Sequence, residues 1–160
     1  MTSNVDRYWG QYVRSLPEGT TQPDGYADSY YFGIVPADAP EISKLVLDGT
    51  KTASGGIKWV YEADGTPMPK PGDLCVITNG HDDPFCIVET VEVQVIPYDE
   101  VGEDFAYEGG EGDRSMADWR RIYWKYIVFE CAKAGREPDV KTLLVMERFR
   151  VAYSQPLAKR

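Results

Sequence analysis

The sequence predicts an α+β fold in which a small sheet or barrel of mostly antiparallel strands is flanked by helices. Turn signals typical of hairpins, including Pro71-Gly72 and Asn79-Gly80, punctuate the middle of the chain. Segments whose apolar residues recur at helical spacing lie on both sides of that region. With 160 residues, the chain is expected to form one domain, residues 1–160, around a sizeable core.

Two helices are predicted in the first third of the chain. The first covers residues 4–16, with its apolar face formed by Trp9, Tyr12, Val13 and Leu16. The second begins at Asp38, an N-cap residue type with Glu41 three residues later, and ends at Gly49. Between them, the aromatic segment 30–34 is expected to be a strand.

Strands are expected in the middle and at the end of the chain. Residues 57–61 follow a glycine-rich segment, and Asp64-Gly65 predicts a turn after them. Strands over 74–78 and 85–96 are joined by the Asn79-Gly80 turn. The last strand is expected over 143–153.

The longest predicted helix runs from Ser115 to residue 134. Ser115 and Asp118 have the spacing of a capping box, and Gly135 follows the last turn. The apolar stripe of this helix, which includes Tyr123 and Tyr126, is expected to pack in the core.

Charge limits the class of partner. Acidic residues outnumber basic ones 26 to 17, for a net charge of −9. Binding along long duplex DNA depends on many cationic contacts to phosphate, so this composition argues against it. A local cleft that holds a short strand or one nucleotide remains compatible with the composition.

The chain is expected to be cytoplasmic and not to interact with membranes. No apolar run approaches the roughly 20 residues of a membrane span, and the first residues lack the pattern of a signal peptide. Cys75, Cys86 and Cys131 lie in apolar surroundings and are expected to be reduced, buried thiols.

The single histidine excludes several kinds of chemistry. His81 lies between Asn79-Gly80 and an Asp-Asp-Pro sequence, so it is expected in an exposed turn. A Ser-His-Asp triad or a multi-histidine metal site is therefore not expected. Cys75 and Cys86 without a nearby histidine make a poor zinc site.

The segment Gly49-Thr50-Lys51-Thr52-Ala53-Ser54-Gly55-Gly56 has the composition of a ligand-binding loop. Its glycines would let backbone amides approach an anion, and Lys51 would supply charge next to the hydroxyls of Thr52 and Ser54. The order of elements differs from that of a P-loop. A polar loop with an exposed lysine is the alternative.

Acidic residues before the long helix form a second candidate cluster. Asp113 and Ser115 could simply cap the helix. If Lys51 and Glu111 meet in a cleft, one could act as a base and the other as an acid. Glu111 and Asp113 could also hold Mg²⁺ through water.

Aromatic residues after the lysine segment could contact a base. Trp59 and Tyr61 lie on one face of the predicted strand and could stack on a nucleobase. Packing in the core is the alternative for each of them.

These motifs, taken in order, resemble the ASCH (activating signal cointegrator homology) domain family, in its bacterial branch with an added N-terminal helix. The resemblance covers residues 30–153 and begins with the lysine segment. It continues through Pro71-Gly72-Asp73, residues 86–93, Gly110-Glu111-Gly112-Asp113-Arg114-Ser115, Trp119-Arg120, Glu130-Cys131 and Glu147-Arg148-Phe149.

The resemblance implies a small β-barrel of the PUA type surrounded by helices, and RNA or nucleotide binding. Some relatives remove the acetyl group from N-acetylcytidine, and others cleave single-stranded RNA. The catalytic residues implied are Lys51, Ser54 and Glu111, with Glu108 as the other candidate carboxylate. Ser54 stands where the amidohydrolases have threonine. Substrate contacts are expected from Thr52, Trp59, Tyr61, Asp113 and Arg114.

Two functions follow as hypotheses. In a hydrolase, Lys51 would deprotonate Ser54 or a water, and Glu111 would protonate the departing cytosine amine. If RNA is cut instead, Lys51 would stabilise phosphate charge and carboxylates would recruit Mg²⁺. The alternative is a non-catalytic module that binds single-stranded RNA or a modified nucleoside or nucleotide, with a homodimer as a further option.

Overall fold

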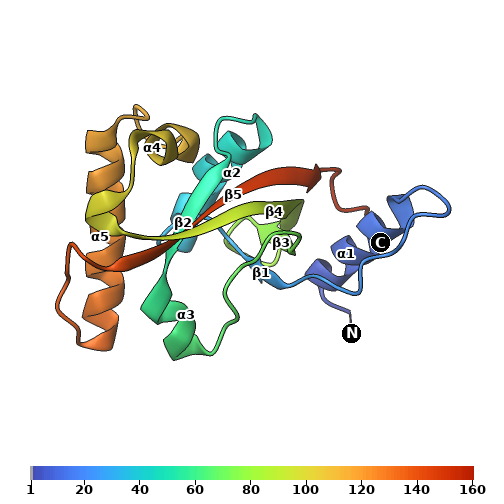
Figure 1. Ribbon diagram of the computed structural model, residues 1–160. Helices are drawn as coiled ribbons and strands as arrows, with labels where there is room; N and C mark the ends of the chain where they lie inside the picture. Colours follow the sequence, from blue (N-terminus) through green and yellow to red (C-terminus); the bar gives the residue numbers. More distant parts are fainter. Residues whose placement is uncertain (1) are drawn as a thin grey trace.

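The sheet is a curled half-barrel of five strands, seen in a computed structural model that describes residues 2–160 (Figure 1). Its strand order is β1 (Asp28–Tyr30), β3 (Leu74–Thr78), β4 (Pro84–Pro97), β5 (Leu143–Tyr153) and β2 (Ala53–Ile57). β1 pairs with β3 in parallel, and the other three pairings are antiparallel. The predicted α+β fold with a mostly antiparallel sheet is confirmed.

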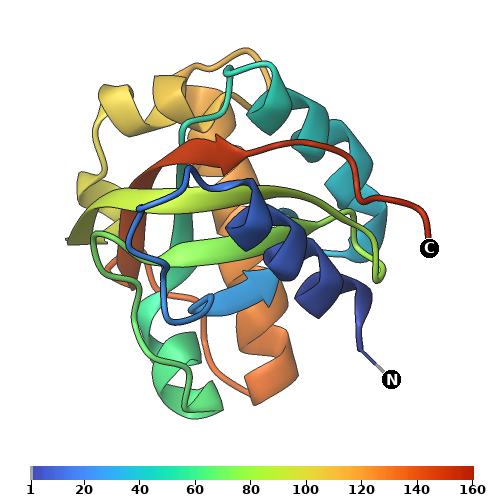
Figure 2. The same ribbon diagram turned by 90° about the vertical axis from the view of Figure 1, so that its right-hand side faces the viewer.

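Helices cover both faces of this sheet. They are α1 (Asn4–Ser15), α2 (Ala39–Leu47), α3 (Lys58–Asp64), α4 (Glu103–Gly109) and α5 (Met116–Ala134), with short 3₁₀ turns at Pro36–Asp38 and Tyr98–Glu100. α1 lies on one face of the sheet and α5 on the other (Figures 1 and 2). Within residues 2–160, no helix is long and apolar enough to cross a membrane.

The core differs from prediction at α1. The fully buried residue of this helix is Tyr8, which packs against Val76 and Ile87 of the sheet. The Tyr8 hydroxyl lies 3.0 Å from the carbonyl oxygen of Phe85 and 2.6 Å from that of Gln155. Trp9 and Tyr12 of the predicted apolar face pack against this cluster, and the structure adds Tyr8 at its centre.

The hairpin and the long helix are confirmed. The Asn79-Gly80 turn joins β3 to β4, and His81 is exposed in it. Ser115 caps α5, since its hydroxyl accepts the backbone N–H of Asp118 at 3.1 Å. The three cysteines are free and buried.

The strand predicted over 57–61 is wrong, because β2 ends at Ile57 and α3 begins at the next residue. Glycine is a poor strand former by propensity, but space is limited beside β2. A Cβ on Gly55 would lie 2.5 Å from Met146 Sδ, and a Cβ on Gly56 would lie 2.7 Å from the Tyr61 ring. Close packing explains why the glycines occupy the strand. Asp64-Gly65 consequently ends α3 instead of forming a hairpin turn.

The strand predicted over 30–34 is also wrong, because β1 ends at Tyr30. The carboxylate of Asp38 accepts the backbone N–H groups of Ile34 and Val35 at 2.9 and 3.1 Å. Asp38 therefore precedes α2, as predicted, but its side chain holds the preceding bend rather than the helix.

α4 was not predicted, and its end packs on the segment that leads into β2. Gly110 ends α4 in the left-handed conformation, with φ of 75°. A Cβ at this position would lie 2.8 Å from the carbonyl oxygen of Thr50. The last turn of α4 and the residues around Lys51 can therefore touch only because residue 110 is glycine.

Replacing Gly110 should disturb the segment around Lys51. Left-handed backbone costs a non-glycine residue about 1–2 kcal/mol, and the Thr50 contact adds a steric penalty in Gly110→Ala. Gly65→Ala is the matched control, because Gly65 ends α3 with φ of 69° and nothing lies within 4 Å of its Cβ position. Urea denaturation should show the larger loss of stability for Gly110→Ala. Equal losses in the two variants would contradict the packing argument.

Candidate functional site

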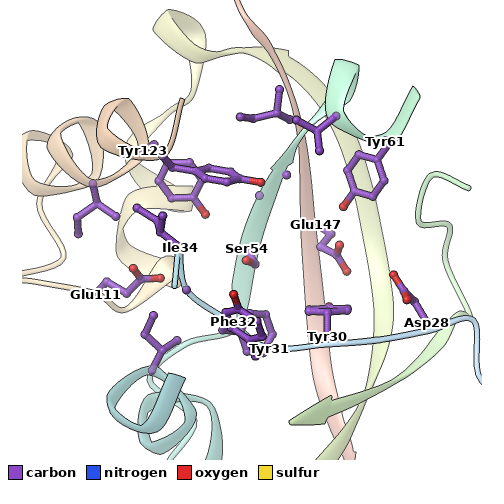
Figure 3. A pocket seen from close by; sticks show the side chains of 18 of the residues that line it. Asp28, Tyr30, Tyr31, Phe32, Ile34, Ser54, Tyr61, Glu111, Tyr123 and Glu147 are labelled. Atoms are coloured by element: carbon purple, nitrogen blue, oxygen red, sulfur yellow. The ribbon is translucent and has the colours of Figure 1, made fainter. Parts of the chain in front are cut away.

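A pocket of about 300 Å³ opens on the sheet beside β2 and β5 (Figure 3). α5 forms one wall and α3 another, while the bend after β1 closes a third side. The residues that line it are Asp28, Tyr30, Tyr31, Phe32, Gly33, Ile34, Ile42, Lys51, Ser54, Gly55, Gly56, Ile57, Val60, Tyr61, Asp64, Thr66, Glu111, Ile122, Tyr123, Tyr126 and Glu147.

Lys51 is the one lysine or arginine among these lining residues, and it is nearly fully buried. Its side chain is 1% exposed, and its Nζ donates to Glu111 Oε1 at 2.6 Å and to the Gly109 carbonyl at 3.2 Å. The ammonium also lies 5.6 Å from the centre of the Phe32 ring. A buried ammonium needs such partners, because removal from water strongly disfavours an uncompensated charge.

Backbone hydrogen bonds fix the segment that carries Lys51. The amides of Thr50 and Lys51 both donate to the Leu45 carbonyl at the end of α2, each at 3.0 Å. Thr52 donates its amide to the Glu108 carbonyl and accepts the Phe149 amide. The segment is therefore tied to α2, α4 and β5 at once.

Glu111, rather than Glu108, is the carboxylate that meets Lys51. Glu111 lines the pocket with its side chain 21% exposed. The carboxylate of Glu108 instead accepts from Arg148 Nε at 2.6 Å, and Arg148 also pairs with Glu92. The structure thus brings together Lys51 and Glu111, which are 60 residues apart in the sequence.

Ser54 and Glu147 are cross-strand neighbours in the pocket. They pair directly in the β2–β5 register, so their side chains lie on the same face of the sheet. Glu147 is only 7% exposed, and its Oε1 accepts the Thr90 hydroxyl at 3.1 Å. Burial raises the pKa of the Glu147 carboxyl, and the negative charge of Asp73 adds to this effect.

The tyrosine walls present neutral hydroxyl groups. Burial raises the pKa of Tyr30, Tyr61 and Tyr123, and raises that of Tyr126 to about 12. These phenols therefore stay protonated at neutral pH and can both donate and accept hydrogen bonds. Their rings give the pocket flat apolar surfaces of the kind on which a base can stack.

Not all the residues predicted to contact substrate line the pocket. Tyr61 does, although it reaches the pocket from a helix. Trp59 packs against the α5 core under the Arg136 guanidinium, and the Thr52 side chain is exposed.

The other two residues predicted to contact substrate support the local fold. The carboxylate of Asp113 accepts the Ser115 amide at 2.8 Å, at the start of α5. Arg114 lies over the Tyr107 ring and donates to the Thr50 carbonyl at 3.3 Å, next to Lys51.

Several residues that line the pocket were not predicted from the sequence to do so. The segment 30–34 is expected to be a strand, and Tyr123 and Tyr126 are expected in the core stripe, yet all of them line the pocket. Glu147 carried a visible signal, because it is an acid that follows the apolar run Leu143-Leu144-Val145-Met146. An acid inside an apolar strand indicates a buried polar site.

The acidic cluster does not fit a magnesium ion. Glu111 is engaged by Lys51, and Asp113 is engaged at the start of α5. In the part of the chain that the structure describes, residues 2–160, His, Cys, Asp and Glu side chains form no group of three or more that could hold a metal ion.

The pocket combines one ion pair with an excess of acidic groups. Lys51 faces Glu111, while Asp28, Asp64 and Glu147 supply three further carboxyl groups. Such a lining suits a flat ligand with hydrogen-bond donors better than one rich in phosphate. The Lys51–Glu111 pair offers a donor and an acceptor at one point of the wall.

Comparison with known proteins agrees with this architecture. The ASCH domain family matches residues 28–153. An ASCH domain from Lactobacillus crispatus JV V101 is 35% identical, with a TM-score of 0.81 over 90% of this chain and 91% of that one. Protein EF3133 from Enterococcus faecalis V583 has the same fold at 24% identity, with a TM-score of 0.81 over 94% of this chain and 89% of that one. No match was found among the curated proteins.

The expected PUA-like fold is thereby confirmed as a curled half-barrel with helices around it. This fold is an RNA-binding fold. Because the match spans most of the sequence, the chain belongs to the ASCH domain family.

Proposed function

We propose that the chain binds one nucleoside, free or within single-stranded RNA, and hydrolyses an amide on its base. The observation that carries this proposal is the buried Lys51–Glu111 ion pair, which lies in a tyrosine-lined pocket together with Ser54. Acid–base groups and a hydroxyl are what amide hydrolysis requires.

The size and charge of the pocket favour a single nucleoside. A volume of about 300 Å³ is at the small end of the range of about 300–1,000 Å³ for small-molecule sites. Lys51 is the only cationic side chain in the lining, and it is already paired. A strand that contacts the protein through several phosphates would meet mostly acidic groups instead.

The ion pair suggests a division of roles in the reaction. Glu111 would take a proton from the attacking water as the water oxygen bonds to the amide carbon. In a two-step route, Ser54 would attack in place of water and form an ester as the amine leaves, and a water molecule would then hydrolyse this ester to the acid and free Ser54. The Lys51 ammonium would stabilise the negative charge that develops on the carbonyl oxygen. When the carbon–nitrogen bond breaks, Glu111 would return the proton to the departing amine, which leaves a carboxylic acid and a free amine.

This division differs from the roles expected from the sequence, where Lys51 is the base and Glu111 the acid. Glu111 is here the base and then the acid, and Lys51 keeps its protons throughout. The reason is the 2.6 Å contact. In an ion pair the carboxylate holds the free lone pairs and the ammonium holds the protons, so the carboxylate is the group ready to accept.

A non-catalytic binding module is the second candidate. It is favoured by the Lys51–Glu111 ion pair, because each of these groups already has a hydrogen-bond partner in the other. The pair would then act only as a fixed polar part of the pocket wall. Ribonuclease activity has less support, since the acidic lining and the engagement of Asp113 at α5 offer little to hold a phosphate or its metal ion.

Turnover should require Lys51. In single-stranded RNA that contains one acetylated cytidine, we expect wild-type protein to remove only the acetyl mass, as read by mass spectrometry. Lys51→Met should lower the rate roughly 100- to 1,000-fold, the usual cost of removing one group that stabilises the developing oxyanion. Shorter RNA fragments would indicate a nuclease. Unchanged RNA would contradict the hydrolase and favour the non-catalytic binding module.

The control for this experiment is Lys141→Met. Lys141 pairs with Asp99 at 2.7 Å, as Lys51 pairs with Glu111, but its side chain is 65% exposed and lies outside the pocket. Full activity in Lys141→Met shows that loss of an ion pair as such does not stop turnover.

Binding should depend weakly on salt. Each phosphate that a protein neutralises on a single strand adds about 0.7 to the slope of log affinity against log salt. With one paired lysine in the pocket, the slope for a short RNA should stay at or below the value for one phosphate, as measured by fluorescence anisotropy. A slope that corresponds to several phosphates would contradict the single-nucleoside proposal.

A further inference from the structure

Glu147 is a buried carboxyl group that the proposed chemistry does not use. It lies on β5 and points into the pocket, beside Ser54 and across from Glu111 (Figure 3). Side chains of this type are seldom buried unless they are paired. No lysine or arginine forms an ion pair with it among residues 2–160.

Only one oxygen of Glu147 is engaged by the protein. Oε1 accepts the hydroxyl of Thr90, itself 1% exposed. The other oxygen, Oε2, has no hydrogen bond from any residue that the structure describes. This oxygen is not among the fully buried side-chain atoms that lack a partner, so it is open to the pocket. A ligand that covered it without donating to it would leave an unpaired acceptor, which costs free energy. The natural partner is a donor on a bound ligand.

Titratable groups surround Glu147 on every side of the pocket. They are Asp28 and Tyr30 on β1, Tyr31 directly after β1, Asp73 before β3, Lys51 and Glu111 near α4, Tyr61 and Asp64 on α3, and Tyr123 and Tyr126 on α5. Lys51 is the one cation among them, and it is held by Glu111 and Gly109. The protein itself therefore leaves Glu147 without a cationic partner.

We propose that Glu147 determines specificity, because its free oxygen accepts a hydrogen bond from an exocyclic N–H of the bound base. This inference rests on the proposed binding of a nucleoside, but not on its hydrolysis. The pocket should then prefer an amino-bearing base such as cytosine to a keto base such as uracil. A carbonyl oxygen placed against Glu147 would leave two acceptors facing each other.

The test compares cytidine with uridine by isothermal titration at neutral pH. The two nucleosides are of similar size, but cytidine has an amino donor where uridine has a carbonyl acceptor. Wild-type protein should bind cytidine roughly tenfold or more tightly, given the usual penalty for an unpaired buried acceptor. The pyrimidin-2-one riboside, which lacks the amino group, should also bind more weakly than cytidine.

Glu147→Gln should reverse the preference. The amide oxygen of glutamine can still accept from Thr90, so that its NH₂ group faces the pocket as a donor. The ratio of cytidine to uridine affinity should fall to about one or invert. Glu89→Gln, on the neighbouring strand and outside the pocket, is the control and should leave the ratio unchanged.

Thermal unfolding separates this role from a structural one. The pKa of Glu147 is raised in the folded state. At a pH above the ordinary pKa of a glutamate, the carboxyl therefore ionises more readily in the unfolded chain, and this lowers the free energy of unfolding. Glu147→Gln should therefore melt at a higher temperature than wild type at pH 7. The advantage should shrink at acidic pH, where the carboxyl is protonated in both states.

The outcomes distinguish the two proposals. A reversed preference without turnover supports the role of Glu147 and overturns the hydrolase. Turnover with an unchanged cytidine-to-uridine ratio in Glu147→Gln overturns the role of Glu147 and leaves the hydrolase. Equal binding of all three nucleosides by wild type, or no binding of any, contradicts the inference whether or not the variant folds.

Discussion

The buried contact between Lys51 and Glu111 is the interaction on which the site depends. It joins the segment before β2 to the loop between α4 and α5, and it requires the close approach that Gly110 permits. A buried ion pair of this kind is weak evidence for stability, since desolvation offsets much of the attraction. Its place in the wall of a pocket gives it a chemical use: it keeps a proton donor and a proton acceptor at one fixed point without water between them.

Glu147 lies on the opposite side of the pocket, with polar neighbours of its own. Thr90 and Ser54 are polar residues on β4 and β2, and both lie next to Glu147. Tyrosine and phenylalanine rings line the pocket together with several polar side chains, of which Lys51 and Glu147 are buried. A ligand would be held by its flat face and oriented by its edge, as in most small-molecule sites.

Much of the architecture follows from local signals, while the site does not. The turn at Asn79-Gly80 and the cap at Ser115 act over a few residues, so the sequence predicts β3, β4 and α5 well. The boundary of β2 and α3 was missed because it depends on Met146 and Tyr61 packing against Gly55 and Gly56. The local pattern around Glu147 indicates a buried acid, but its position beside Ser54 follows only from the β2–β5 register. Lys51 and Glu111 were paired correctly because both lie in motifs of the family.

The most direct test of this account is NMR of the lysine side-chain ammonium groups during titration with cytidine. Lys51 is buried and held by two acceptors, so its ammonium should exchange slowly with water and give a resolved signal, which Lys51→Met would assign by its loss. We expect that signal to move on addition of cytidine, while signals of exposed lysines such as Lys141 stay in place. An unchanged Lys51 signal at saturating cytidine would show that the ion pair does not face the ligand, and would contradict the account.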